Sequence, residues 1–165
     1  TVLLSVGLIP ENELSRQAGV EIDPKTQGPV VNSVMQTSVK GIFACGNVLH
    51  VNDLVDYVTV EAEKAGFWAA KYVQNELAES DLREVKVTTG ENVRTVVPQK
   101  IIPGIDVSLF LRVFKPGKDR VLNVLVDGDK IIQKRCPSVT PSEMLRADLK
   151  AEYTVNAKSI NVEVC

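Results

Sequence analysis

A short apolar run that ends at a glycine, followed by a long helical pattern, constrains the fold of this chain most. Ile42-Phe43-Ala44 has the length of a buried strand, and Gly46 follows where a side chain would block close approach to the backbone. After a loop, a helical pattern opens near Asp56 and runs to about Leu77. This order predicts that the N-terminus of the helix lies beside the carboxyl end of the strand, where a ligand could contact the main chain.

The helical pattern carries one stripe of small and apolar residues. Its members are Val58, Ala62, Ala65, Ala69, Tyr72 and Val73. Gly66 lies beside them, and small side chains allow a neighbouring backbone to come close. Packing alone explains such a stripe, because burial of each large apolar side chain contributes on the order of 1.5–3 kcal/mol.

Composition and charge exclude several classes of protein. The chain has 165 residues, a net charge of -2 and 5% aromatic residues, so it has few features of a nucleic-acid-binding protein. It has neither an apolar run of transmembrane length nor a basic leader, and we expect a cytosolic location. Cys45, Cys136 and Cys165 are too far apart for a Cys-x-x-Cys pair or, with the single His50, for a metal site. We therefore expect reduced thiols and no metal.

A change of periodicity along the chain predicts two domains. Residues 1–78 form an α/β unit, the polar stretch 79–92 is interpreted as a linker, and residues 93–165 repeat with period two. This last part predicts a small all-β, antiparallel, sandwich-like domain, with a hairpin turn at Asp127-Gly128. The expected strands are Val93 to Ile102, Val107 to Phe114, Val121 to Val126, Lys130 to Arg135, Glu143 to Ala151 and Ile160 to Val164. A domain this small is expected to pack on its neighbour or on a second copy.

The first residues predict a piece of a longer protein. Thr1 to Leu8 begins directly in an apolar strand pattern, and natural domains rarely start in the middle of a strand. Pro10 and Gly19 bound a short helix. The turn formers at 23–29 then precede a strand at Val30-Val31-Asn32.

The central stretch resembles the second flavin-binding motif of the pyridine nucleotide-disulfide oxidoreductases. The pattern is Thr37-x-x-x-Gly41-Ile42-Phe43-Ala44-x-Gly46-Asn47, followed by the helix with its Ala/Gly stripe. Within that superfamily, residues 46–56 look most like the FAD-dependent dehydrogenases that accompany anaerobic glycerol-3-phosphate dehydrogenase. The resemblance covers roughly the first half of the chain. It implies that residues 1–78 are the C-terminal part of a Rossmann-like FAD/NAD(P)-binding domain.

The resemblance also implies two groups of flavin contacts. Gly46, Asn47 and Val48 correspond to positions near the ribityl and phosphate chain. Asp56, Tyr57 and Val58 correspond to the helix N-terminus at the flavin ring, whose dipole favours the negative charge of reduced flavin. The family usually has Asp where this chain has Asn47, whose amide oxygen accepts the same bond without charge assistance. The alternative is an ordinary turn asparagine.

No residue is predicted to act as an acid, base or nucleophile. His50 has no identifiable carboxylate partner in the sequence and is expected to be structural or solvated. The family carries two Gly-x-Gly-x-x-Gly fingerprints, and both are missing here, so we expect the isolated chain to bind no FAD and to be inactive. The complete protein would transfer hydride from NAD(P)H to flavin. The alternative is a non-catalytic module whose β portion docks a partner dehydrogenase subunit or forms a homodimer.

Overall fold

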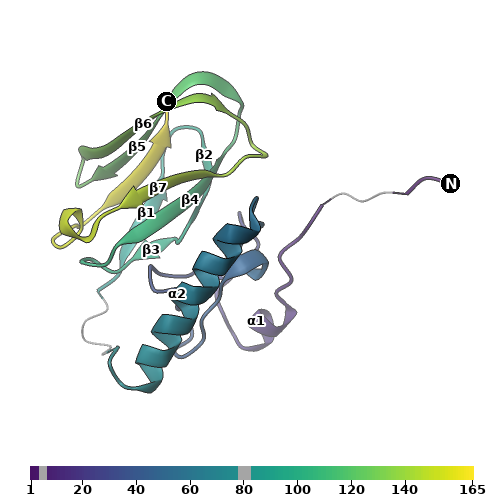
Figure 1. Ribbon diagram of the computed structural model, residues 1–165, viewed down its shortest axis with the longest axis vertical. Helices are drawn as coiled ribbons and strands as arrows, with labels where there is room; N and C mark the ends of the chain where they lie inside the picture. The colour runs from purple at the N-terminus through teal and green to yellow at the C-terminus, as the bar shows by residue number, and fades with distance from the viewer. Residues whose placement is uncertain (4–6, 78–82) are drawn as a thin grey trace.

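A computed structural model describes residues 1–3, 7–77 and 83–165. In Figure 1 a strand-rich body lies above a long helix, α2 (Val55–Val73), whose first turn is the end nearest the strands. The short helix α1 (Glu13–Gln17) and the 3-10 turn η1 (Gly46–Val48) precede α2. The strands and the remaining 3-10 turn are β1 (Val85–Thr89), β2 (Val93–Val97), β3 (Lys100–Ile101), β4 (Val107–Val113), β5 (Gly117–Val126), β6 (Asp129–Val139), β7 (Leu145–Leu149), η3 (Ala151–Tyr153) and β8 (Ile160–Val164).

The strands form two sheets that enclose one apolar core. The order is β3-β1-β8-β5-β6 in the larger sheet and β2-β4-β7 in the smaller one. Alternate residues of each strand point inward because successive side chains lie on opposite faces of a sheet. The fully buried side chains at the centre include Leu109, Leu122 and Ile160. The core of the β part is therefore built entirely from the second half of the chain.

One strand pair corrects the predicted antiparallel domain. β1 runs parallel to β8, with Val87 opposite Ile160, whereas the other pairs are antiparallel. A parallel pair needs a long crossover connection, and the whole β part connects these two strands. β1 also lies within residues 79–92, which were interpreted as a linker, so the strands begin earlier than predicted. Residues 79–82 of that range lie outside the described residues.

The later strands were predicted at nearly the right places. The expected run from Val93 to Ile102 divides into β2 and β3 around Pro98, which has no N–H to donate to a ladder. β5 begins four residues before the predicted Val121, and β6 continues to Val139. The turn between them contains Asp127 and Gly128, with φ of 51° and 94°, as the hairpin motif requires.

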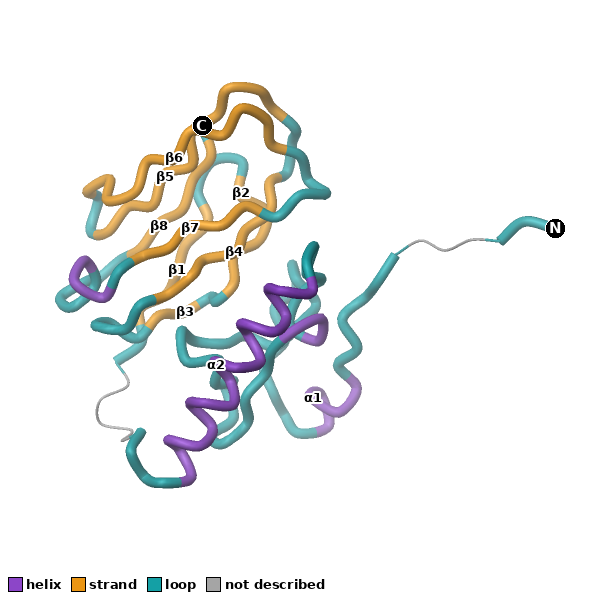
Figure 2. Tube along the Cα trace, viewed as in Figure 1, coloured by secondary structure: helices purple, strands orange, loops and turns teal. Residues whose placement is uncertain are grey.

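The strands predicted in the first half are wrong. Ile42-Phe43-Ala44 and Val30-Val31-Asn32 take part only in isolated bridges, such as Gln36 with Phe43 and Val31 with Thr37. Figure 2 shows this region as loops packed beside α2. A strand needs a paired neighbour, and none of the described segments supplies one here. Residues 4–6 of the strand predicted at Thr1 to Leu8 lie outside the described residues, and the rest of that stretch is not strand.

Both predicted helices are present, although α2 ends at Val73 instead of near Leu77. The stripe on α2 is only partly buried. Ala65 is 6% exposed, and Val58, Ala69 and Tyr72 are half-buried. Ala62, Gly66 and Val73 are exposed, which the prediction did not expect. Among the described residues no helix combines the length and apolarity needed to cross a bilayer.

The first half packs directly on the β part. Val97 of β2 joins Val31, Met35 and Leu49 in a second apolar cluster. The buried Gln99 side chain accepts the Val31 N–H at 3.0 Å and donates to Asp23 at 3.1 Å. The β part therefore holds the loops against which α2 lies.

Candidate functional site

The turn at Gly46 is fixed against the first turns of α2. Gly46 has φ of 69°, and a Cβ built there would lie 3.2 Å from Val58 Cγ1. Its N–H donates to Glu61 Oε2 at 2.7 Å. Both the left-handed backbone and the close approach favour glycine. The structure therefore brings together Gly46 and Val58, two of the six predicted contacts.

A buried carboxylate on α2 connects this turn to His50. Glu61 is 4% exposed, and its Oε1 lies 2.6 Å from His50 Nε2. His50 is itself 8% exposed. Sequence reasoning found no carboxylate partner for His50 and missed Glu61. The available signal was that Glu61 lies three residues after Val58 and four before Ala65, and so on the same face of the helix.

The β part adds aromatic and cationic side chains around this loop. The Phe110 ring of β4 lies 5.8 Å from the His50 ring and 5.2 Å from the Tyr57 ring, between centroids. The Arg146 guanidinium of β7 is 5.9 Å from the centre of the Tyr57 ring and 5.8 Å from that of Phe110. These distances allow cation–π attraction. Phe110 and Arg146 were not predicted, because nothing local in the sequence connects β4 and β7 to α2.

The loop between η1 and α2 is held from both sides. Asn47 is exposed, and its Oδ1 accepts the Asn52 N–H at 3.0 Å. Asp53 accepts the Met144 N–H at 2.6 Å and contacts the Arg112 guanidinium. Arg112 also donates to the Val51 carbonyl at 3.0 Å. Asn47 therefore has the local contact of a turn asparagine and keeps further capacity to accept a bond.

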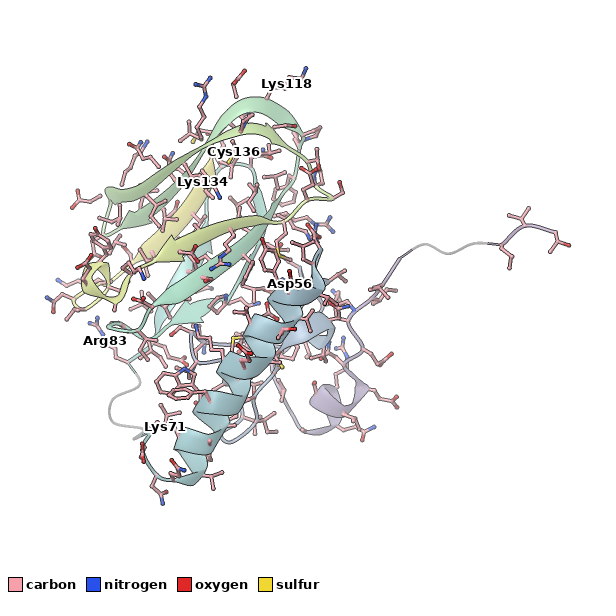
Figure 3. All side chains as sticks on the ribbon, in the orientation of Figure 1. Asp56, Lys71, Arg83, Lys118, Lys134 and Cys136 are labelled. Atoms are coloured by element: carbon pink, nitrogen blue, oxygen red, sulfur yellow. The ribbon has the colours of Figure 1, made fainter. Side chains whose placement is uncertain are left out.

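The N-terminus of α2 has no side-chain cap. Leu54 occupies the cap position and makes no side-chain hydrogen bond. Asp56 is exposed, and Tyr57 and Val58 are half-buried. Figure 3 labels Asp56 at the end of α2 nearest the strands and Lys71 near the opposite end. The first N–H groups of a helix and its dipole favour an acceptor oxygen at this end.

Cys45 is not set up as a reactive thiol. Burial, and then the negative charge of Glu61, raise the pKa of the Cys45 thiol above its ordinary value. A raised pKa keeps the thiol protonated near neutral pH, and the thiolate is the reactive form. Within the described ranges no three or more His, Cys, Asp or Glu side chains gather as metal ligands.

The fit to a flavin differs between the two ends of the cofactor. The uncapped start of α2 and the adjacent Tyr57 suit a ring carbonyl oxygen. The Gly46 N–H is already bonded to Glu61, so a cofactor contact at that turn would use other atoms. The chain has no Gly-x-Gly-x-x-Gly cradle for the diphosphate. The residues present therefore suit the ring end and offer no glycine-rich cradle for the diphosphate.

Comparison with known proteins bears on this same region. Residues 1–66 match the family model described as pyridine nucleotide-disulphide oxidoreductase. A stretch of 54 residues is 43% identical to a Klebsiella pneumoniae protein named nitric oxide reductase FlRd-NAD(+) reductase. That stretch is 33% of this chain and only 14% of the relative. No solved structure matches the chain.

The match to the family model, at residues 1–66, covers the candidate site. It includes all six predicted contacts as well as His50 and Glu61, and it ends before the β part begins. The particular likeness to the dehydrogenases that accompany anaerobic glycerol-3-phosphate dehydrogenase stays a prediction, since neither the family description nor the relative's name refers to it.

Proposed function

We propose that this chain is the flavin-ring end and C-terminal β domain of an FAD-dependent NAD(P)H oxidoreductase. The observation that carries the proposal is the Gly46 turn, bonded to α2 through Glu61 beside an uncapped helix N-terminus. This arrangement lies within the residues that match the oxidoreductase family. FAD, when bound, would supply the acceptor for a hydride from the nicotinamide. The chain's own residues would bind the flavin and orient its ring.

Each group of residues has one part in this proposal. Gly46, Asn47 and Val48 contact the ribityl and phosphate chain, and Asp56, Tyr57 and Val58 present helix N–H groups and dipole to the ring. The dipole favours negative charge at this end of α2. Glu61 is a positioning residue, because its hydrogen bond with the Gly46 N–H fixes the orientation of the turn toward the ligand.

The exposed face of α2 supports a larger domain around this site. Val55 and Val73 are 78% and 79% exposed, and a Cβ built on Gly66 would have no atom within 4 Å. We propose that this face packs on the rest of the oxidoreductase domain. Small residues permit the close approach that such packing needs. Alone, the chain is then expected to bind no FAD and to turn nothing over.

The test compares the isolated chain with the longer protein that contains it. The longer protein is expected to purify with a visible flavin band and to oxidise NADH or NADPH, and the isolated chain to be colourless. In the longer protein, Asn47→Ala should weaken flavin binding, whereas Asn156→Ala, at an exposed turn residue, should not. A colourless longer protein that gains no flavin on titration with FAD would contradict the proposal.

One observation favours a second role for the β part. Its core is closed on itself, and it lies outside the region that matches the oxidoreductase family. As the alternative, we propose that the β part docks a partner subunit or forms a homodimer. Light scattering on residues 83–165 and on the whole chain tests this, because a module that self-associates gives a dimer mass in both. A monomer in both would contradict the homodimer.

A further inference from the structure

A polar cavity of about 420 Å³ lies between α2 and the β4–β7 pair. α2 contributes Lys64, and the β part contributes the other charged side chains. The cavity's polar and charged lining residues are Lys64, Asp106, Ser108, Arg146, Asp148 and Lys150. None of the six predicted flavin contacts lines it, so an inference drawn from it does not depend on the proposed function.

Both carboxylates of the cavity already have partners. Asp106 Oδ2 lies 2.8 Å from Lys150 Nζ, and Asp106 Oδ1 accepts the Ala151 N–H at 2.8 Å. Asp148 Oδ1 accepts the Ser108 hydroxyl at 2.6 Å and the Arg146 Nε–H at 2.8 Å. Each acid is therefore matched by one cation of its own, Lys150 or Arg146.

Lys64 is the cation left over. Its side chain is half-buried, and its one hydrogen bond in the described part of the chain is a 3.4 Å contact to the Asp106 carbonyl. Burial lowers the pKa of the Lys64 ammonium, although the charges of Asp106 and Glu61 act in the opposite direction. A partly desolvated cation without an acid partner is costly, and an anion that enters the cavity would relieve that cost.

We propose that the cavity between α2 and the β4–β7 pair binds a small oxyanion, a phosphate or carboxylate group, with Lys64 as its principal cation. Among the side chains that line the cavity, Arg146 and Lys150 are paired with the two carboxylates, and Lys64 is not. The nearby Glu61 carboxylate is already engaged with the Gly46 N–H and His50. Charge-assisted hydrogen bonds from an ammonium to an oxyanion are among the stronger ones in proteins. Arg146 and Lys150 also line the cavity, each paired with its own carboxylate, and the Ser108 hydroxyl is a further polar neighbour.

The experiment titrates the 165-residue chain with inorganic phosphate and, separately, with acetate at constant ionic strength set by chloride. Isothermal titration calorimetry should show saturable binding of at least one anion, and the better ligand identifies phosphate or carboxylate as the group. Lys64→Met should weaken that binding by roughly tenfold or more, and Lys64→Arg should retain most of it. Lys71→Met is the matched control, because Lys71 lies two turns further along α2 and pairs with Glu76.

Several outcomes would overturn the inference. These are no saturable binding of either anion, unchanged binding by Lys64→Met, or equal weakening by Lys71→Met, which would indicate a general charge effect. Should Lys64→Met fail to fold, acetylation of lysines in the wild-type chain, read by mass spectrometry, provides a second measurement. The anion should protect Lys64 and leave Lys71 unprotected, and equal labelling with and without the anion would contradict the site.

Discussion

Glu61 holds two parts of the site at once, with Oε1 2.6 Å from His50 Nε2 and Oε2 2.7 Å from the Gly46 N–H. Glu61→Ala is expected to destabilise the chain by about 2 kcal/mol, because it leaves buried polar groups unpaired. Urea unfolding measures this change. Glu61→Gln should cost less, since an amide still offers an acceptor and a donor. Glu63→Ala, at an exposed position of the same helix, is the control and should change little. Equal effects at 61 and 63 would show that the buried bonds contribute nothing.

Two glycine substitutions should have opposite effects on the stability of the chain. A Cβ on Gly28 would lie 1.8 Å from the Leu49 carbonyl oxygen, so Gly28→Ala should destabilise the chain by at least about 2 kcal/mol. Gly66 is a helix residue with open space beside it, and Gly66→Ala should stabilise the isolated chain by about 0.5–1 kcal/mol. Thermal unfolding of the two variants compares them directly. A destabilising Gly66→Ala would mean that this helix face is already occupied in the isolated chain.

Arg112 connects β4 to the loop before α2. It donates to the Val51 and Ser142 carbonyls and contacts Asp53. Arg112→Met should lower stability by about 1–2 kcal/mol, because those acceptors lose a charged donor. Hydrogen exchange should rise in residues 50–55 more than in β5. The exposed Arg94→Met is the control, and faster exchange spread evenly over both regions would contradict a local role for Arg112.

The contribution of Lys64 to the free energy of unfolding should change with pH in the alkaline range. Burial lowers the pKa of its ammonium below the ordinary 10.5, so the folded chain holds that proton less tightly than the unfolded chain does. Stability from this group therefore rises with pH between the folded pKa and 10.5. The pKa values of the Cys45 and Cys165 thiols are raised in the folded chain, so above pH 9.0 these two groups lower the free energy of unfolding as the pH rises.

The comparison with Lys64→Met isolates the lysine from the two thiols. The free energy of unfolding of the wild type, minus that of Lys64→Met, should increase as the pH rises from neutral toward 10.5. Chemical denaturation at a series of pH values measures this difference. A difference that stays constant over the range would contradict the lowered pKa.

Local patterns were sufficient where an element's own residues decide its form. The period-two runs after Val93 and the Asp127-Gly128 turn predicted the later strands at nearly the right places, although β2 and β3 were expected as one run. The periodicity after Asp56 predicted α2. Each of these elements contains its own apolar face and its own end signals. The same reasoning failed at Ile42-Phe43-Ala44, because a strand exists only when a neighbour pairs with it. β1 was missed because it follows a polar stretch, and its strand character depends on pairing with β8 at the far end of the chain.

At the candidate site, the sequence by itself determined that Gly46 and the N-terminus of α2 are neighbours, because few residues separate them. Their flavin contacts stay a prediction. Only the tertiary structure decided what surrounds them: Glu61 beside His50, and Phe110, Arg112 and Arg146 from the β part. It also decided that Lys64 remains without a carboxylate partner in the described part of the chain. The physical reason is that helix and turn formation depend on nearby residues, whereas burial and charge pairing depend on contacts between segments far apart in the chain.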